Sequence, residues 1–89
     1  MSEYIVENGQ TVFEHVVSGD ESMYIRNKGT ANYTTVNSDG SMFISKGGKA
    51  YNPEINKYGS MFICGGTVSS ATLTNGGYFV LSGGTINNI

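Results

Sequence analysis

The chain has 89 residues, of which 13% are charged and 13 are glycine, and its formal net charge is −2 at pH 7. Its few basic residues are scattered, which argues against a nucleic-acid-binding surface. The single cysteine excludes an internal disulfide, and no apolar run approaches the roughly 18 residues of a membrane helix. We therefore expect one small domain, without nucleic-acid binding or membrane insertion.

A repeat of about nineteen residues runs through the chain from Tyr4 onward. The repeats divide residues 1–89, as a single repeat domain, into the coils 4–22, 23–41, 42–60, 61–78 and the partial 79–89. The fourth is one residue shorter, and the loss falls just before Gly65-Gly66. Glycines recur at two places in each unit, which predicts two turns and at least two short strands per coil.

Apolar residues recur at fixed positions of the repeat. Three aliphatic columns are Val6, Ile25, Ile44, Ile63 and Leu81, then Val17, Val36, Ile55 and Leu73, and lastly Val12, Ala31, Ala50, Val68 and Ile86. One such coil cannot bury its apolar side alone, whereas stacked coils can. The pattern predicts an all-β fold, a parallel β-solenoid of about 4.5 coils, with the columns inside. A β-meander sandwich of short strands is the alternative.

A column of aromatic residues precedes the first aliphatic column by one position. Tyr24, Phe43 and Phe62 form its centre, with Ile5 and Val80 at its ends. Successive side chains of a strand point to opposite faces, so these rings are expected on the outer surface. They are the predicted ligand or partner surface, because exposed rings stack on sugars or pack against another subunit. The alternative is a ladder of rings that only stabilises the fold.

The residue types that carry catalysis are few and dispersed. His15 is the only histidine and Cys64 the only cysteine, and they lie in different repeats. A catalytic triad or a histidine-based metal cluster cannot be assembled from them. Asp20 and Asp39 share one position of the repeat, where turn residues are expected. We predict that the protein is not an enzyme and has no catalytic residues, no cofactor and no metal site.

The stretch 29–48 resembles the AIDA-type repeat of bacterial autotransporter adhesins, which alternates a GGTAxxTxVxxGG half with a GGxxxVxxGG half. The matching residues are Thr30-Ala31, Thr34, Val36, Gly40, Ile44 and Gly47-Gly48. Asp39 departs from the pattern by replacing one glycine of a pair, and Pro53 by replacing a threonine. The resemblance implies a right-handed parallel β-helix that forms part of a passenger stalk at the cell surface.

These observations favour a non-catalytic structural or adhesive repeat segment of a bacterial cell-surface or secreted, autotransporter-like protein. The alternative function is a glycan-binding module that uses Tyr24, Phe43 and Phe62. Expected partners are a host-surface glycan or protein and, through the open solenoid ends, further copies of the chain. The first residues lack a signal-peptide pattern, so the location is implied by the resemblance, and we expect a fragment of a longer protein.

Overall fold

The computed structural model describes residues 2–74 and 76–87, which form three parallel sheets. Sheet A contains β1 (Ser2–Val6), β4 (Glu21–Ile25), β7 (Ser41–Ser45), β10 (Ser60–Cys64) and β13 (Tyr78–Leu81). Sheet B contains β2 (Thr11–Phe13), β5 (Thr30–Asn32), β8 (Lys49–Tyr51), β11 (Thr67–Ser69) and β14 (Thr85–Asn87). Sheet C contains β3 (Val16–Val17), β6 (Thr35–Val36), β9 (Glu54–Ile55) and β12 (Thr72–Leu73).

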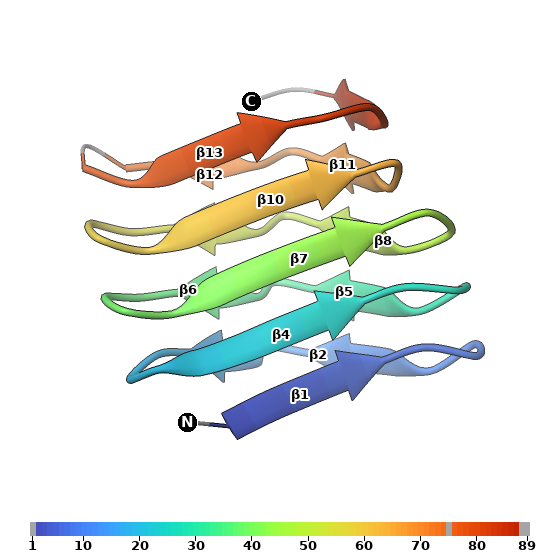
Figure 1. Cartoon of the computed structure of the whole chain (residues 1–89), viewed down its shortest axis with the longest axis horizontal. Coiled ribbons are helices and arrows are strands. Elements are labelled where there is room, and N and C mark those ends of the chain that lie inside the picture. Colours follow the sequence, from blue (N-terminus) through green and yellow to red (C-terminus); the bar gives the residue numbers. More distant parts are fainter. Residues whose placement is uncertain (1, 75, 88–89) are drawn as a thin grey trace.

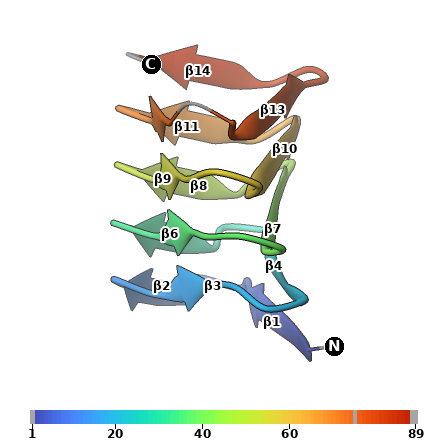
Figure 2. The ribbon, with the colours of Figure 1, turned by 90° about the vertical axis from the view of Figure 1, so that its left-hand side faces the viewer.

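Each strand pairs in parallel with its equivalent in the next coil, so the predicted β-solenoid is confirmed. Ile25 pairs with Ile44, and Ile44 pairs with Ile63, one full repeat apart. In Figure 1 the strands of sheet A run left to right in front, the chain returns behind them, and each coil lies above the last. The solenoid is therefore right-handed. Figure 2 shows the coils as successive layers, with sheet A along one side.

The core is the stack of inward side chains between the three sheets. The strands of sheet A alternate, so that both Met42 and Ile44 of β7 are fully buried while Phe43 between them faces outward. The aliphatic columns predicted from the sequence are buried through the central coils. The column of Met23, Met42 and Met61 is buried as well, and methionine is flexible enough to fill irregular gaps in a core.

Glycines at the turns allow successive coils to lie close together. A Cβ atom on Gly29 would overlap the carbonyl oxygen of Val6, and one on Gly48 would overlap that of Ile25. A larger residue would push the two coils apart and break the hydrogen bonds between them. Close backbone approach therefore explains why glycine recurs at these positions.

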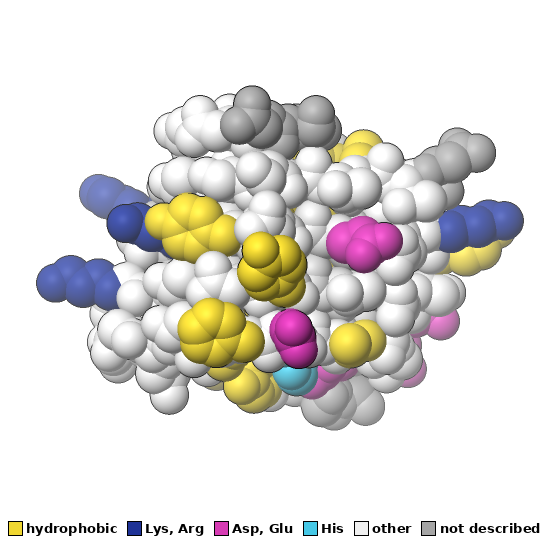
Figure 3. All heavy atoms as spheres, turned by 180° about the vertical axis from the view of Figure 1, so that it is seen from behind, with side chains coloured by type: hydrophobic (Ala, Val, Ile, Leu, Met, Phe, Trp, Pro, Cys, Tyr) yellow, Lys and Arg dark blue, Asp and Glu magenta, His cyan; other side chains and the backbone are white. Residues whose placement is uncertain are grey.

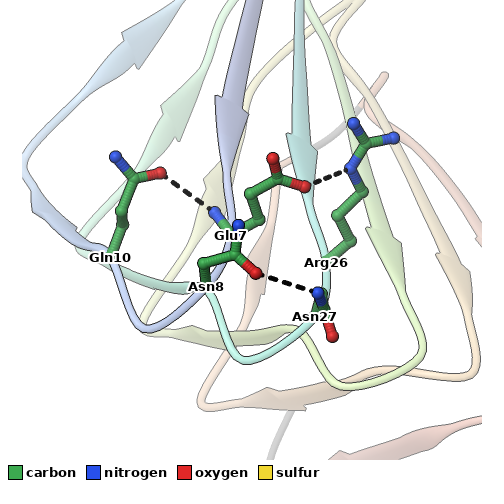
Figure 4. Close-up of polar contacts among 5 residues, drawn as sticks. All are labelled: Glu7, Asn8, Gln10, Arg26 and Asn27. Carbon is green, nitrogen blue, oxygen red and sulfur yellow. Dashed lines mark hydrogen bonds and ion pairs between the residues drawn. The ribbon is translucent and has the colours of Figure 1, made fainter.

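Polar side chains form pairs between the stacked turns. In Figure 4 the Asn27 amide nitrogen donates to the Asn8 amide oxygen at 3.0 Å, and Nε of Arg26 lies 3.0 Å from Oε1 of Glu7. On the opposite turn, Asn56 donates to the oxygen of Asn37 at 2.7 Å. The exposed Arg–Glu pair contributes little to stability, because water screens it. The amide pairs add side-chain hydrogen bonds between neighbouring coils at the turns, beside the backbone hydrogen bonds of the strands.

The two ends of the stack are covered differently. In the first coil Val6 and Val17 are almost completely buried. In the last coils the residues of the same columns, Leu81 and Leu73, are 50% and 41% exposed. The part of the chain that the structure describes contains no helix with the length and apolar character needed to cross a membrane.

We predict that Ile44→Asn lowers the free energy of unfolding by about 3–5 kcal/mol, because it leaves a cavity and buries an unpaired amide. Ile44 is 0% exposed and packs between coils on both sides. The matched control is Ser45→Asn, at the next residue of β7, which we expect to change stability by less than about 0.5 kcal/mol. Denaturant unfolding monitored by circular dichroism measures both. Equal midpoints would contradict the assigned packing.

Candidate functional site

The aromatic column lies on the outer face of sheet A, and its rings stack on one another. The ring centroids of Tyr24 and Phe43 are 5.0 Å apart, with planes inclined by 12°. Phe43 and Phe62 are also 5.0 Å apart, inclined by 11°. Tyr78 closes the row with an edge contact to Phe62 at 6.0 Å. The register of β4, β7 and β10 imposes this spacing, because it places the three residues directly opposite one another.

Stacking determines which parts of the three rings are accessible. Each face that meets a neighbouring ring is covered, and all three side chains are half-buried. Each stacked pair contributes about 0.5–1.5 kcal/mol beyond the area that it buries. The column therefore stabilises sheet A and presents mainly ring edges to the solvent. Its assignment as a ligand surface stays a prediction.

His15 has a structural role at the first coil. Its ring stacks on Tyr4, with centroids 4.2 Å apart and planes inclined by 11°. Nε2 of His15 lies 3.4 Å from Oε2 of Glu21, which is long for a hydrogen bond. Tyr4 occupies the column that holds methionine in the next three coils. Two larger rings thus replace smaller side chains of these columns in the first coil.

The other candidate residues lie apart from one another. Cys64 is exposed at the end of β10, and its partner in the register is Ser45. Asp20 and Asp39 occupy turns and adopt left-handed backbone angles, with φ of 69° and 67°. Among the residues that the structure describes, no three histidine, cysteine or acidic side chains are grouped to hold a metal ion. The described surface also carries no pocket.

A second group of aromatic residues escaped the sequence analysis. Phe13 and Tyr51 face outward from sheet B, and Tyr33 lies at the corner between sheets B and C. Phe13 and Tyr51 share a column but are separated in it by Asn32, and Tyr33 lies in the neighbouring column. No two of these rings are adjacent in one column, so a search for repeated residue types misses them. The alternation of side chains along a strand could have found two of them. Phe13 lies two positions after Thr11 in β2, and Tyr51 lies two positions after Lys49 in β8, so each faces outward like the polar residue before it.

The corner between sheets B and C has an unusual backbone. Glu14, Tyr33, Asn52 and Ser70 take equivalent positions in four coils, with φ of 56°, 57°, 56° and 57°. In each, the backbone N–H donates to a carbonyl of the next coil, as from Tyr33 to Tyr51 at 2.8 Å. Left-handed angles favour glycine and asparagine and are unfavourable for a bulky ring. Tyr33 is therefore held in a strained conformation by the register of its coil.

These features define the class: a right-handed parallel β-solenoid with three sheets and no concave site on its described surface. The chain is similar in structure to a hyper-glycosylated TibA fragment that was modified in a TibC-catalysed reaction, with a TM-score of 0.67 and 22% sequence identity. The alignment covers 98% of this chain and 50% of that one, so the chain spans half the length of that fragment. At this identity the likeness shows the fold alone.

No protein-family model matches the chain, and no curated protein matches it in sequence. The likeness to the AIDA-type repeat thus rests on the motif residues of the sequence.

A polar atom lies unpaired inside the core next to the corner. The inward column that begins with His15 continues with Thr34, Pro53 and Ala71. Thr34 is almost completely buried, and its Oγ1 has no hydrogen-bond partner among the described residues. An unpaired buried hydroxyl costs stability, because it loses its hydrogen bonds to water.

We predict that Thr34→Val raises the free energy of unfolding by about 1 kcal/mol, because valine has the same shape without the unpaired hydroxyl. Thr35→Val is the matched control, since Thr35 faces outward from β6 and is half-exposed. We expect the control to change stability by less than about 0.5 kcal/mol. Thermal unfolding of the two variants measures the difference. A loss of stability in Thr34→Val would show that a water molecule pairs with the hydroxyl.

Proposed function

We propose that the protein is a non-catalytic structural or adhesive repeat segment of a bacterial cell-surface or secreted, autotransporter-like protein. The observation that carries the proposal is the unbroken parallel register of the coils, from β1 to β13 in sheet A and from β2 to β14 in sheet B. A stack of this kind lengthens by about 4.8 Å with each coil, so reach grows in proportion to the number of repeats.

The mechanics of the fold suit a stalk. Backbone hydrogen bonds between coils run along the axis of the stack, as from Lys49 to Gly29 and from Thr67 to Gly48, both 3.0 Å. A pull along the axis loads many of these bonds in parallel. The likeness in fold to the hyper-glycosylated TibA fragment supports the proposal, and the AIDA-type motif residues support the surface location.

A second candidate function is glycan binding through the ladder of Tyr24, Phe43 and Phe62. Three half-exposed rings in one outward column favour it. The stacking argues for a restricted form of contact, because a sugar would reach only ring edges and the hydroxyl of Tyr24.

We also propose that the chain self-associates through the coil that contains Leu81. Leu73 and Leu81 continue two buried columns but are themselves 41% and 50% exposed. The strands β12, β13 and β14 are the last of their sheets, so each presents a row of backbone groups that a further strand would pair with. A second copy of the chain supplies such strands.

The proposed surface location predicts that antibodies to this segment label intact cells of the bacterium that makes it. Protease treatment of intact cells should remove the labelling, because a stalk extends outside the membrane. An antibody to a cytoplasmic protein, which labels only permeabilised cells, is the control. Labelling of this segment that also required permeabilisation would contradict the proposed location.

For self-association, we expect the 89-residue chain to sediment as a dimer or larger stack in the upper micromolar range. The double variant Leu73→Lys/Leu81→Lys should shift it to monomer, because charges would be buried at the contact. Thr72→Lys/Ser82→Lys adds the same charge at exposed neighbouring positions and should leave the association unchanged. Analytical ultracentrifugation measures all three. A monomeric parent chain, or equal effects of the two double variants, would rule out this contact.

A further inference from the structure

Three consecutive coils present isolated aromatic rings at the corner between sheets B and C. Phe13 in β2 is 69% exposed and Tyr33 at the corner is 59% exposed, while Tyr51 in β8 is partly exposed. None of the three stacks on another aromatic ring among the described residues, in contrast to the ladder on sheet A. No other aromatic ring of the described chain occupies their faces.

The rings alternate with polar side chains both from coil to coil and between neighbouring residues of one coil. Along sheet B the register is Phe13, Asn32 and Tyr51. Along the corner the equivalent positions are Glu14, Tyr33 and Asn52. Each coil thus supplies one ring and one amide or carboxylate. The ring lies on sheet B in the first and third of these coils and at the corner in the second. We call this set of six residues the corner array.

The amides of the corner array are unengaged. Neither Asn32 nor Asn52 makes a side-chain hydrogen bond within the described part of the chain, whereas Asn27 and Asn56 pair with the coil below them. A free amide offers two donors and one acceptor to a ligand. Among the described residues, the array therefore combines exposed rings that stack on no other ring with amides that make no side-chain hydrogen bond, about 4.8 Å apart from coil to coil.

Tyr33 occupies a backbone position that is unfavourable for its side chain. Its φ of 57° is unfavourable for a bulky side chain, and the same position holds Asn52 in the next coil with φ of 56°. Asparagine would satisfy the backbone at less cost. The left-handed angle recurs at this position in four coils, so the register imposes it, and tyrosine bears a backbone cost here that asparagine would avoid.

The surroundings of the array indicate what it binds. Figure 3 shows hydrophobic side chains gathered on this face with acidic ones among them, and the basic side chains confined to its two sides. Glu14 and the exposed Glu54 disfavour an anionic ligand. The rings are separated by polar groups and lie on a surface without a pocket, unlike the continuous apolar centre of a protein interface. Ring faces attract the weakly positive C–H bonds of sugars.

We propose that the corner array binds an uncharged glycan chain. Phe13, Tyr33 and Tyr51 serve as stacking platforms, and Asn32, Asn52 and Glu14 hydrogen-bond its hydroxyl groups. The chain lies along the solenoid axis across three coils, a length of about 10 Å between the outer platforms. The inference rests on the adhesive form of the proposed function, and it places the ligand on a different face from the ladder of sheet A.

The test uses the 89-residue chain and four hexasaccharides: cellohexaose, maltohexaose, chitohexaose and, as the anionic probe, hexagalacturonic acid. Titration followed by NMR should give saturable binding of at least one neutral probe and weaker binding of the anionic one. Tyr33→Asn should lower the affinity about three- to tenfold through loss of one ring contact. The same variant should melt at a higher temperature, because it relieves the strained backbone, so weaker binding cannot be assigned to unfolding.

Tyr58→Asn is the matched control, because Tyr58 is 66% exposed and also left-handed, with φ of 66°, but lies at the turn between sheets C and A. It should melt higher as well and bind the probe unchanged. Absence of binding by all neutral probes, or equal effects of the two variants, would overturn the proposal. Binding lost in Phe43→Leu but kept in Tyr33→Asn would move the site to the ladder. Failure of the array leaves the stalk proposal standing, since surface labelling tests that separately.

Discussion

The backbone hydrogen bonds between successive coils are the interaction on which the rest of the structure depends. Arg26 donates to Val6 at 2.9 Å, and Thr30 donates to Gln10 at 2.9 Å, and equivalent bonds recur up the stack. They hold each residue over its counterpart one repeat earlier. A slip of one residue would turn the methionine and isoleucine columns outward and the aromatic ladder inward, so burial and hydrogen bonding select the same register.

Stacking like residues has opposite consequences for different side chains. Apolar residues gain a continuous core, and amides such as Asn37 and Asn56 pair with each other. Charges of one sign repel when they are stacked, which agrees with the low charge of the chain. Aromatic rings stacked in one column cover their own faces, as Phe43 does. A ligand surface on such a scaffold is therefore expected where the repeat is broken, and the corner array is a place of that kind.

The first and the last described coils differ in how far the residues of their columns are exposed. At the first coil Tyr4 and His15 replace smaller residues of their columns and stack on each other, and Val6 and Val17 of the same coil are buried. At the last coil Leu73 and Leu81 keep the repeat pattern and remain exposed. The two coils thus differ because the first departs from the repeat pattern and the last keeps it.

The sequence by itself determined the period, the inward columns and the parallel solenoid, because a repeat that buries Ile25, Ile44 and Ile63 at one position leaves few other arrangements. It also placed Tyr24, Phe43 and Phe62 on the outside, since strand alternation is local. Only the tertiary structure decided that their faces are covered and that Tyr33 is strained. It also placed Phe13, Tyr33 and Tyr51 at one corner, because Tyr33 occupies a different position of the repeat from the other two and adjoins them only when the coils stack.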